Sequence, residues 1–184
     1  MERLILSFIL TTFSLFGCQP ATENTTAAEP LVSEAVQNPK NPYYSRTDTT
    51  KLNLPDATWK KILSPEVYHI ARDKGTEMAY TGKLWDHHGV GTYYCAACGN
   101  ALFKSDTKYD SQCGWPSFYK ELRATSVTYQ TDKSHGMVRT EVLCGRCDAH
   151  LGHIFNDGPP PTGKRFCMNS AVLDFEPDVN PAFR

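Results

Sequence analysis

Seven cysteines carry the most reactive side chains of this chain, and their spacing divides them into two groups. Four of them form two pairs with the spacing Cys-x-x-Cys, in the stretches CAACGN and CGRCDAH. These pairs are Cys95 with Cys98 and Cys144 with Cys147. The other three cysteines have no cysteine nearby in the sequence and are Cys18, Cys113 and Cys167. Spacing alone therefore predicts at least two different uses of cysteine in one chain.

The two Cys-x-x-Cys units are spaced like the ligands of a metal site. Two such units can surround one ion with four thiolates, the tetrahedral arrangement that structural zinc prefers. Gly99 and Gly145 each directly follow a cysteine, and glycine suits the tight turns that such units need. We therefore expect a closed structural zinc site, with each unit at the end of a different hairpin.

Two other uses of these four cysteines remain open on spacing alone. An oxidising compartment favours disulfides, and the chain has enough cysteines for several pairings. A Cys-x-x-Cys unit can also be a redox pair of the thioredoxin type, but no βαβ pattern surrounds either unit. Zinc that stays bound to four unreactive sulfurs would exclude a general thiol–disulfide oxidoreductase.

The two unpaired cysteines of the C-terminal half lie in settings that favour reactivity. In KRFCMNS, Cys167 follows Arg165, and a cation near a thiol favours the nucleophilic thiolate. On a strand these two residues would share one face. In KYDSQCGWPSF, Cys113 precedes Gly114 and lies close to Pro116, which predicts a loop where a cysteine can move and act as a resolving thiol. The alternatives are an inert disulfide between them or two buried thiols.

Polar and aromatic side chains near these cysteines could complete a site. His150 and His153 flank Gly152 in DAHLGHIFND, without the H-E-x-x-H pattern of a zinc protease. They are free to donate hydrogen bonds, although two structural histidines would fit the spacing equally well. Asn169 adds a neutral donor two residues after Cys167, and Trp115 offers an apolar wall next to Cys113.

Short elements must position these residues. LPDATWKKILSPEVYHIARDKGTE predicts two short helices, the first capped by Asp56 and the second by Ser64 with Pro65 at its first position. After Gly82 the chain contains short β-like stretches: GTYYC, ALFKS, SVTYQTD, MVRTEVLC, HLGHIF and RFCMNSAVLDF. Strands in series without intervening helices form antiparallel sheets. We expect a mainly β domain with a small helical lead-in.

The N-terminus has the features of an export signal. An apolar stretch from Leu4 to Phe16 is too short to span a bilayer but fits a signal peptide over residues 1–17. The following Gly17-Cys18 resembles the lipobox of bacterial lipoproteins, whose cysteine is lipidated and becomes the new N-terminus. The alternative is an ordinary signal cleaved elsewhere. Because Gln19 is not aspartate, the usual sorting pattern favours the outer membrane over the inner one, with the protein facing the periplasm.

The segment after the predicted lipid site has few large apolar residues. Residues 18–52 are rich in Thr, Ala, Pro, Asn and Glu, and such a segment cannot bury enough surface to offset its ordering entropy. We expect a flexible tether, with the folded domain at residues 53–184. The chain holds 19 Lys and Arg against 20 Asp and Glu. It therefore lacks the basic field that would hold nucleic acid.

Several linked motifs together resemble one known family. LSPEVYHIARDKGTE, GTYYCAACGNALFKSDTKYDSQCGWPSFY and SHGMVRTEVLCGRCDAHLGHIFNDGPPPTGKRFCMNSAVLDF are similar to the B class of peptide methionine sulfoxide reductases. The resemblance covers about Leu54 to Phe175, nearly the whole predicted domain. It implies a mainly β fold of two small antiparallel sheets with a structural Zn²⁺ site and short N-terminal helices. The implied substrate is methionine-R-sulfoxide in oxidised proteins.

The resemblance also implies roles for individual residues. Cys167 falls at the nucleophile position, Cys113 at the resolving cysteine and the four paired cysteines at the zinc ligands. The expected polar groups around the sulfoxide oxygen and the nucleophile are His150, His153, Asn169 and Arg165. The expected substrate-binding residues are Trp115, which would pack on the substrate methyl, together with His135 and Phe166.

A mechanism follows from these assignments. Cys167 would attack the sulfoxide sulfur and become a sulfenic acid, and Cys113 would condense with it to a disulfide. A thioredoxin-like dithiol would then reduce that disulfide. We expect a monomer anchored to the membrane through its N-terminal lipid. The alternative function is a non-catalytic binding module on the same zinc-bearing β scaffold, which would have no need for both unpaired cysteines.

Overall fold

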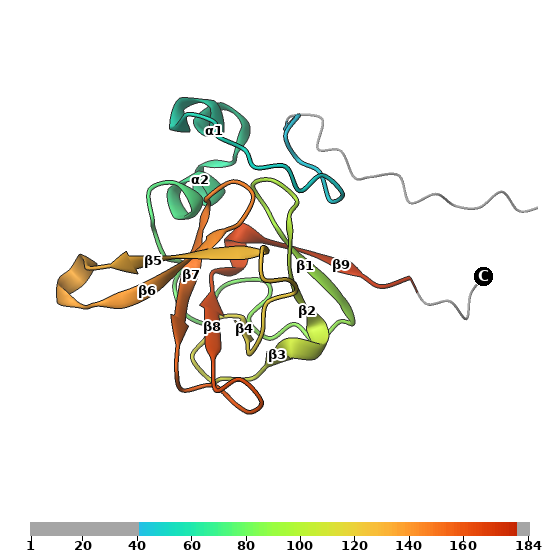
Figure 1. Ribbon diagram of the computed structural model, residues 1–184, viewed down its shortest axis with the longest axis vertical. Coiled ribbons are helices and arrows are strands. Elements are labelled where there is room, and N and C mark those ends of the chain that lie inside the picture. Colours follow the sequence, from blue (N-terminus) through green and yellow to red (C-terminus); the bar gives the residue numbers. More distant parts are fainter. Residues whose placement is uncertain (1–40, 180–184) are drawn as a thin grey trace, which may run out of the picture. The chain divides into compact units, whose positions relative to one another are not determined.

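The computed structural model of the protein describes residues 41–179, and these form a mainly β domain (Figure 1). Two short helices precede two antiparallel sheets. The predicted fold class is therefore confirmed. The predicted signal peptide, the lipid site at Cys18 and most of the predicted tether lie outside the described residues. None of the helices among residues 41–179 is both long and apolar enough to cross a membrane.

The helices α1 (Asp56–Ile62) and α2 (Pro65–Ala71) occupy the predicted region. Ser64 caps α2 as expected, because its hydroxyl accepts a hydrogen bond from the amide of Val67 at 3.3 Å. Asp56 does not cap α1, whose N-cap is Pro55 without a side-chain hydrogen bond. Its carboxylate instead accepts a hydrogen bond from Nε of Arg72 at 2.7 Å, which joins the two helices.

The smaller sheet has three strands in the order β2-β1-β9. These strands are β1 (Gly91–Cys95), β2 (Ala101–Lys104) and β9 (Leu173–Pro177). β1 and β2 form a hairpin whose turn carries the first Cys-x-x-Cys unit, and β9 is the last strand of the described chain. A three-residue 3₁₀ turn, η3 (Ser170–Val172), leads into β9 from the larger sheet.

The larger sheet has six strands in the order β3-β4-β8-β7-β6-β5. Its strands are β3 (Lys108–Tyr109), β4 (Ser117–Phe118), β5 (Val127–Asp132), β6 (Arg139–Cys144), β7 (His150–Phe155) and β8 (Arg165–Met168). Two further 3₁₀ turns are η1 (Ser105–Thr107), before β3, and η2 (Ser134–Gly136), at the tip of the β5–β6 hairpin. The turn between β6 and β7 carries the second Cys-x-x-Cys unit.

Alternation along the central strands separates an aromatic face from a polar one. Phe118 lies opposite Phe166 on β8, and Ile154 of β7 lies opposite the same residue. Phe118 stacks on Phe103 of the smaller sheet with ring centroids 4.3 Å apart, so this face of the larger sheet packs into the shared core. The next position along β8 is Cys167, which therefore points to the other face.

The start of the folded domain differs from the prediction. The sequence predicted a flexible tether as far as residue 52, whereas the structure places residues 41–52 against the two Cys-x-x-Cys turns. Asn41 and Tyr44 are buried, and the amide of Ser45 donates to the carbonyl of Cys98 at 3.0 Å. Local composition could not reveal this, because the partners lie far away in the sequence.

Arg146 makes the main contacts with this segment. Its side chain is only 3% exposed, and its guanidinium donates hydrogen bonds to several acceptors. Nη1 donates to the carbonyls of Tyr43 at 2.8 Å and Cys98 at 2.6 Å, and Nη2 to the carboxylate of Asp48 at 2.7 Å. The buried guanidinium of Arg146 thus holds residues 43–50 against both turns that carry the Cys-x-x-Cys units.

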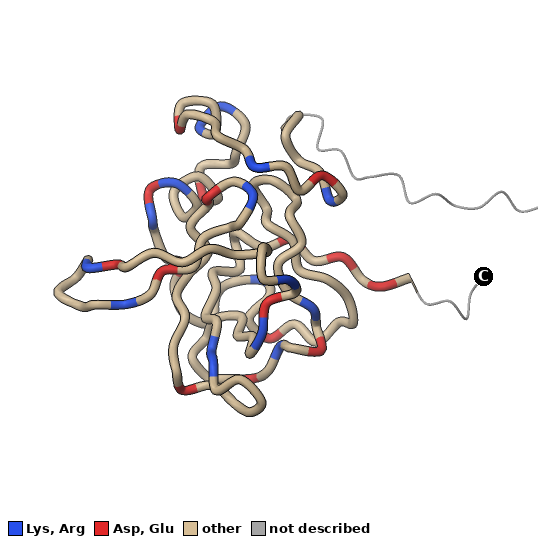
Figure 2. Tube along the Cα trace, in the orientation of Figure 1, with Lys and Arg blue, Asp and Glu red and all other residues tan. Residues whose placement is uncertain are grey.

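Basic and acidic residues are interspersed along the described chain (Figure 2). Surface pairs combine both signs, such as Lys51 with Asp148 at 2.5 Å and Lys104 with Asp178 at 2.8 Å. Such exposed pairs contribute little stability individually. The buried guanidinium of Arg146 is a different case, because its loss would leave carbonyls without a partner.

Replacing Arg146 with methionine should lower the free energy of unfolding by about 3 kcal/mol, since buried acceptors lose a charged donor. Residues 43–50 should also lose protection against amide hydrogen exchange. Urea unfolding and hydrogen-exchange mass spectrometry measure the two effects. The matched control is Lys51→Met, a surface cation of the same segment, with an expected loss below about 0.5 kcal/mol. Equal losses in both variants would contradict the assignment.

Candidate functional site

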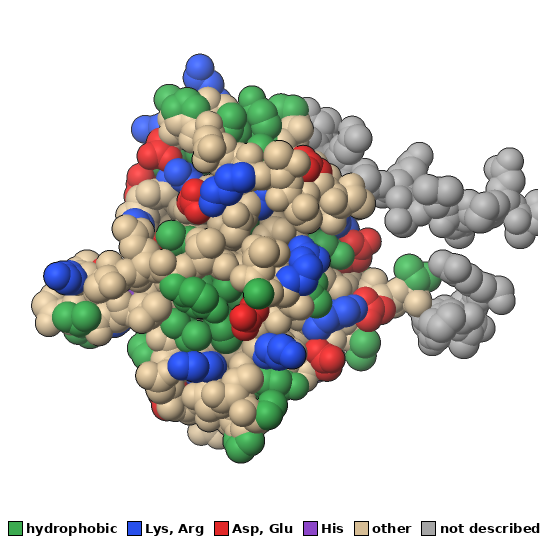
Figure 3. Space-filling model, viewed as in Figure 1, with side chains coloured by type: hydrophobic (Ala, Val, Ile, Leu, Met, Phe, Trp, Pro, Cys, Tyr) green, Lys and Arg blue, Asp and Glu red, His purple; other side chains and the backbone are tan. Residues whose placement is uncertain are grey.

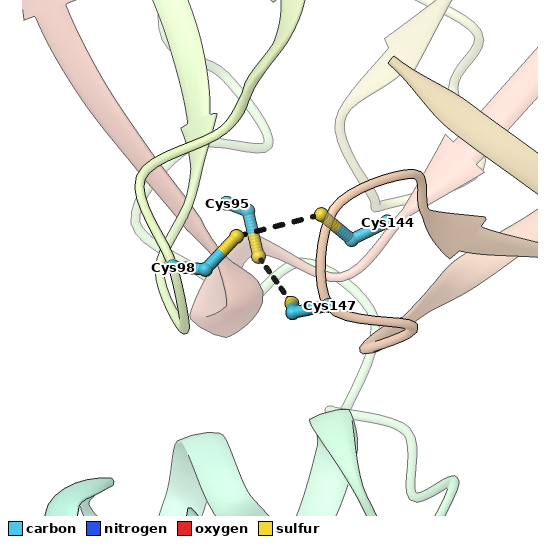
Figure 4. Close-up of side chains that lie close together, drawn as sticks. All are labelled: Cys95, Cys98, Cys144 and Cys147. Carbon is cyan, nitrogen blue, oxygen red and sulfur yellow. Dashed lines mark hydrogen bonds between the residues drawn. The ribbon is translucent and has the colours of Figure 1, made fainter. Parts of the chain in front are cut away.

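Four sulfur atoms meet where the two sheets join (Figure 4). The Sγ atoms of Cys95 and Cys147 lie 3.8 Å apart, and those of Cys98 and Cys144 lie 3.6 Å apart. All four atoms lie within 4.8 Å of one another and all four residues are buried. The separations are far longer than the S–S bond of about 2.05 Å in a disulfide. The four cysteines are therefore free thiols or metal ligands.

The cluster has the dimensions of a zinc site. Zn–S bonds of about 2.3 Å in a tetrahedron place the sulfur atoms about 3.8 Å apart, close to the separations seen here. The amide of Asn100 also approaches Sγ of Cys144 at 3.6 Å, as a donor to a thiolate would. The predicted grouping of the four cysteines is confirmed, and the cluster fits a zinc site.

Local backbone geometry explains how the first turn brings its cysteines together. Gly99 has a φ of +78°, and a Cβ there would lie 2.6 Å from the carbonyl oxygen of Ser45. Its amide donates to the carbonyl of Cys95 at 2.7 Å, which closes the turn. Only glycine allows both the positive φ and the close approach of the N-terminal segment.

Cys113 and Cys167 form a second, separate sulfur pair. Their Sγ atoms lie 3.6 Å apart without a bond, Cys167 on β8 and Cys113 on the loop between β3 and β4. The structure thus brings the two unpaired cysteines together before any chemistry. The sequence suggested a resolving cysteine that approaches afterwards. Here the loop is already tied down, because Tyr80 donates from its amide to the carbonyl of Gly114 and from its hydroxyl to the carbonyl of Gln112, at 2.8 and 2.6 Å.

The contact between the two thiols makes their acidities unequal. The pKa of Cys113 is lowered to about 4, first because the Cys167 thiol donates to it, although burial opposes the shift. The hydroxyls of Ser111 and Ser117, at 2.9 and 3.5 Å, act in the same direction as Cys167. The pKa of Cys167 is raised, first by that same hydrogen bond and then by burial, while Arg165 opposes the shift. The pair therefore carries one negative charge and one shared proton.

A pocket of about 130 Å³ opens beside Cys167. Its walls combine aromatic groups, hydrogen-bond donors and the sulfur atom, contributed by Thr76, Trp115, Arg139, Gly152, His153, Phe155, Cys167, Met168 and Asn169. A polar row crosses the sheet here, since His153 on β7 lies opposite Cys167, and Ser117 on β4 lies opposite it on the other side. Cross-strand neighbours point to the same face, so this row forms one wall of the site.

Gly152 explains why β7 can lie so close to the nucleophile strand. A Cβ at this position would lie 2.1 Å from the carbonyl oxygen of Cys167. The glycine between the two predicted histidines is therefore a packing requirement. It fixes the approach of β7 to β8, and with it the position of His153 beside the sulfur pair.

The two predicted histidines have different positions. His153 lines the pocket, and its Nε2 lies 2.8 Å from Oδ2 of Asp132. His150 is buried and not part of the pocket wall; its Nδ1 lies 2.7 Å from Oε1 of Glu141. Burial is the main reason that the pKa of His150 is lowered. Its ring centroid lies 5.5 Å from that of His153, so His150 stands behind the pocket rather than in it.

Glu77 holds both Trp115 and Asn169 in place. Its carbonyl accepts from Nε1 of Trp115 at 3.3 Å, and its amide donates to Oδ1 of Asn169 at 3.1 Å. Its carboxylate accepts from the amides of Ser170 and Ala171 at 2.6 and 2.9 Å. Both predicted residues line the pocket, and one glutamate positions them.

Arg165 lies near Cys167 as predicted, and two of its three nitrogen donors are engaged by Asp157. Nε and Nη2 form a bidentate pair with Asp157 at 2.9 and 2.8 Å. The guanidinium carbon also lies 4.3 Å from the centroid of the Phe155 ring. Arg165 therefore acts on the sulfur pair through its charge, and it is not part of the pocket wall.

Two predicted substrate-binding residues lie away from the pocket. Phe166 is buried in the core, its ring centroid 5.5 Å from that of Phe103, because neighbours along a strand face opposite sides. His135 lies in η2 at the tip of the β5–β6 hairpin, which projects from the sheet and exposes Met137 and Val138 (Figure 3). Both residues had been expected at the substrate, and the structure corrects this.

Three residues of the site were not predicted from the sequence: Glu77, Asp132 and Arg139. Asp132 and Arg139 face each other across the β5–β6 hairpin, 2.6 Å apart, at the ends of two predicted strands. Opposite charges at matched positions of a hairpin were the available signal. Glu77 gave none, because its partners lie far along the chain.

Comparisons with known proteins agree on one family. A family model described as the SelR domain matches residues 63–177. The peptide methionine sulfoxide reductase MsrB of Thiobacillus denitrificans is 62% identical over 122 residues, which cover 66% of this chain and 92% of the relative. The protein of the same name from Leptospira interrogans is 59% identical over 126 residues, covering 68% and 96%. That of Acinetobacter baylyi is 56% identical over 128 residues, covering 70% and 92%.

The unequal acidities predict which thiol reacts first with an alkylating agent. At about pH 6, limiting iodoacetamide should modify Cys113 before Cys167, because a lowered pKa leaves Cys113 as the thiolate. In Cys113→Ser the hydrogen bond that raises the pKa of Cys167 changes and the neighbouring negative charge is lost. The pKa of Cys167 should then fall and its alkylation accelerate by about tenfold. Peptide mapping by mass spectrometry identifies the modified residue, and early labelling of Cys167 in the unaltered protein would contradict the prediction.

Proposed function

The chain belongs to the SelR-domain family and is a peptide methionine sulfoxide reductase, and we propose that it reduces the R epimer of protein-bound methionine sulfoxide with Cys167 as the nucleophile. The observation that carries this proposal is the 3.6 Å separation of Cys113 and Cys167 at the edge of a mixed apolar and polar pocket. A binding module would need neither the sulfur pair nor its position.

The first step transfers the oxygen atom. A sulfoxide sulfur is a poor electrophile until its oxygen accepts strong hydrogen bonds, so the site needs donors on one side and an apolar wall on the other. Trp115 and Phe155 supply apolar surface for the methyl group, and His153 and Asn169 are polar groups beside Cys167. The Cys167 thiolate attacks the sulfur, and the oxygen passes to the Cys167 sulfur as the S–O bond to the methionine sulfur breaks. Uptake of one proton then gives the Cys167 sulfenic acid and methionine.

The second step uses Cys113. Its sulfur attacks the sulfenic sulfur of Cys167, a disulfide forms, and the oxygen leaves as water with the proton that the sulfenic acid already carries and one proton from the Cys113 thiol. A thioredoxin-like dithiol then reduces the disulfide by exchange and becomes a disulfide itself. The observed sulfur separation supports this step, because only a small movement joins the two atoms.

Selectivity for one epimer follows from the arrangement of the walls. The peptide chain of a protein substrate must remain in solvent, the methyl group suits the aromatic wall, and the oxygen suits the donors. Fixing the positions of these three substituents also fixes the position of the lone pair on sulfur, so only one epimer fits the pocket in this orientation. We assign His150, held by Glu141 behind His153, a supporting rather than a contacting role.

We also propose a structural Zn²⁺ at the four buried sulfurs and export of the protein as a lipoprotein anchored at Cys18. The support for zinc is the sulfur spacing described above. The support for export is the apolar N-terminal stretch that ends in Gly17-Cys18. Four bound thiolates leave no open metal position, so the metal would hold the two turns together and take no part in the reaction.

An assay with separated R and S epimers of N-acetyl-methionine sulfoxide amide tests the function. The unaltered protein should reduce the R epimer and leave the S epimer unchanged. Cys167→Ser should lose essentially all turnover, by more than about 10⁴-fold, because serine is not a comparable nucleophile at sulfur. Retained turnover in this variant, or preference for the S epimer, would contradict the proposal.

Cys113→Ser serves as the matched control for that assay. It should release about one equivalent of methionine in a single turnover, because the first step needs only Cys167. Recycling by a thioredoxin-like dithiol should be strongly impaired. Normal recycling in this variant would refute the role of Cys113 and leave the role of Cys167 intact.

Native mass spectrometry of the protein extracted from membranes tests the metal and the anchor independently. The expected mass is that of a chain beginning at Cys18 with a diacylglyceryl group and one zinc ion. Cys144→Ser should lose the zinc and unfold at lower denaturant concentration. A metal-free native mass would contradict the zinc site, and an unmodified chain with another N-terminus would contradict the anchor.

A further inference from the structure

Two arginines lie on either side of Phe155 on the polar face of the larger sheet. Arg165 on β8 is directly opposite Phe155 on β7. Arg139 on β6 precedes Thr140, which pairs with Ile154, so Arg139 comes level with Phe155 from the other side. Arg139, Phe155 and Arg165 therefore form a second row on the same face. It lies two residues along the strands from the row that contains Cys167 and His153. The sequence singled out only Arg165.

The two arginines differ in what their donors do. Arg165 donates from Nε and Nη2 to the carboxylate of Asp157 and is not part of the pocket wall. Arg139 lines the pocket and donates from Nη2 to Asp132 at 2.6 Å and to Ser134 at 3.3 Å. Its Nε is buried and has no hydrogen-bond partner among the described residues. A buried N–H without an acceptor is unfavourable, and an acceptor atom in the adjoining pocket would relieve it.

Asp132 limits what His153 can do for the same acceptor. One oxygen of Asp132 lies 2.8 Å from Nε2 of His153 and 2.6 Å from Nη2 of Arg139. A carboxylate only accepts, so the N–H at Nε2 of His153 is directed at Asp132. That N–H is therefore not available to a sulfoxide oxygen. A guanidinium carries its donors at every working pH.

We infer that Arg139 is a catalytic residue that donates a hydrogen bond from Nε to the sulfoxide oxygen, with Asp132 as the residue that positions it. The inference rests on the proposed function. As the Cys167 thiolate approaches the sulfur, electron density moves onto the oxygen, and a fixed cationic donor stabilises that state more than the ground state. Arg139 keeps its proton throughout, and the oxygen takes up its proton separately, as in the first step above.

The first test is kinetic, with the R epimer of N-acetyl-methionine sulfoxide amide as substrate. Arg139→Lys keeps the positive charge but has no Nε–H or planar fork, and kcat/KM should fall by about 100-fold, of which about tenfold appears in kcat. The matched control is Lys133→Gln, an exposed cation of the same hairpin, with kcat/KM within about twofold of the unaltered protein. Unchanged kcat in Arg139→Lys, or an equal loss in Lys133→Gln, would overturn the inference.

The second test asks whether the oxygen is what Arg139 contacts. In the Cys167→Ser background, which stops the chemistry, NMR titration gives the dissociation constants of the R-sulfoxide amide and of the methionine amide that lacks the oxygen. Arg139→Lys should weaken binding of the sulfoxide by about tenfold and leave that of the thioether unchanged. Equal weakening of both ligands, or of neither, would show that Arg139 does not bind the oxygen.

A third measurement covers the case that Arg139→Lys does not fold. In the Cys167→Ser protein with native Arg139, ¹⁵N-labelled arginine reports each Nε–H directly. The Arg139 signal should move downfield with the R-sulfoxide amide and not with methionine amide; the same shift with both, or none, would overturn the inference. Failure of the proposed function shows elsewhere, as retained turnover in Cys167→Ser, so the two failures are distinguishable.

Discussion

The junction of four sulfur atoms between two hairpin turns is the constraint on which the rest of the structure depends. One turn belongs to the smaller sheet and the other to the larger one, so the cluster of Cys95, Cys98, Cys144 and Cys147 holds the sheets in one relation (Figure 4). β7 begins shortly after the second turn and carries His153 directly beside β8. A small domain has a limited core, and a metal bound at such a junction adds stability that the core alone would not supply. Arg146, inside the second turn, extends the same junction to residues 43–50.

The register between β7 and β8 turns that scaffold into a site. A shift by one residue would exchange the faces, and Cys167 would enter the core while Phe166 entered the pocket. Two features oppose the shift. Phe166 packs among the aromatic rings of the core, and Gly152 alone lets the β7 backbone approach the carbonyl of Cys167. The register between β7 and β8 is therefore required both for core packing on one face of β8 and for the site on its other face.

Local signals were enough for the parts of the fold that depend on local chemistry. Ser64-Pro65 identified the start of α2, and cysteine spacing separated the four-sulfur cluster from the reactive pair. Most of the failures share one physical cause, since they involve contacts between residues far apart in the sequence or on opposite faces of an element. Phe166 adjoins Cys167 in the chain yet faces away from it, and Glu77 binds Trp115 and Asn169 across gaps that no short motif records.

The single negative charge of the sulfur pair connects this geometry to the proposed chemistry. At rest, the hydrogen bond between the thiols lowers the pKa of Cys113 and raises that of Cys167, so the proposed nucleophile is the protonated partner. A protonated thiol resists oxidation by small oxidants, because the thiolate is the reactive form. Transfer of one proton across 3.6 Å makes Cys167 the thiolate, and the charge of Arg165 favours that state. The contact between the two thiols thus keeps Cys167 protonated at rest and also holds Cys113 where the disulfide must form. One arrangement of the loop that carries Cys113 therefore serves both purposes.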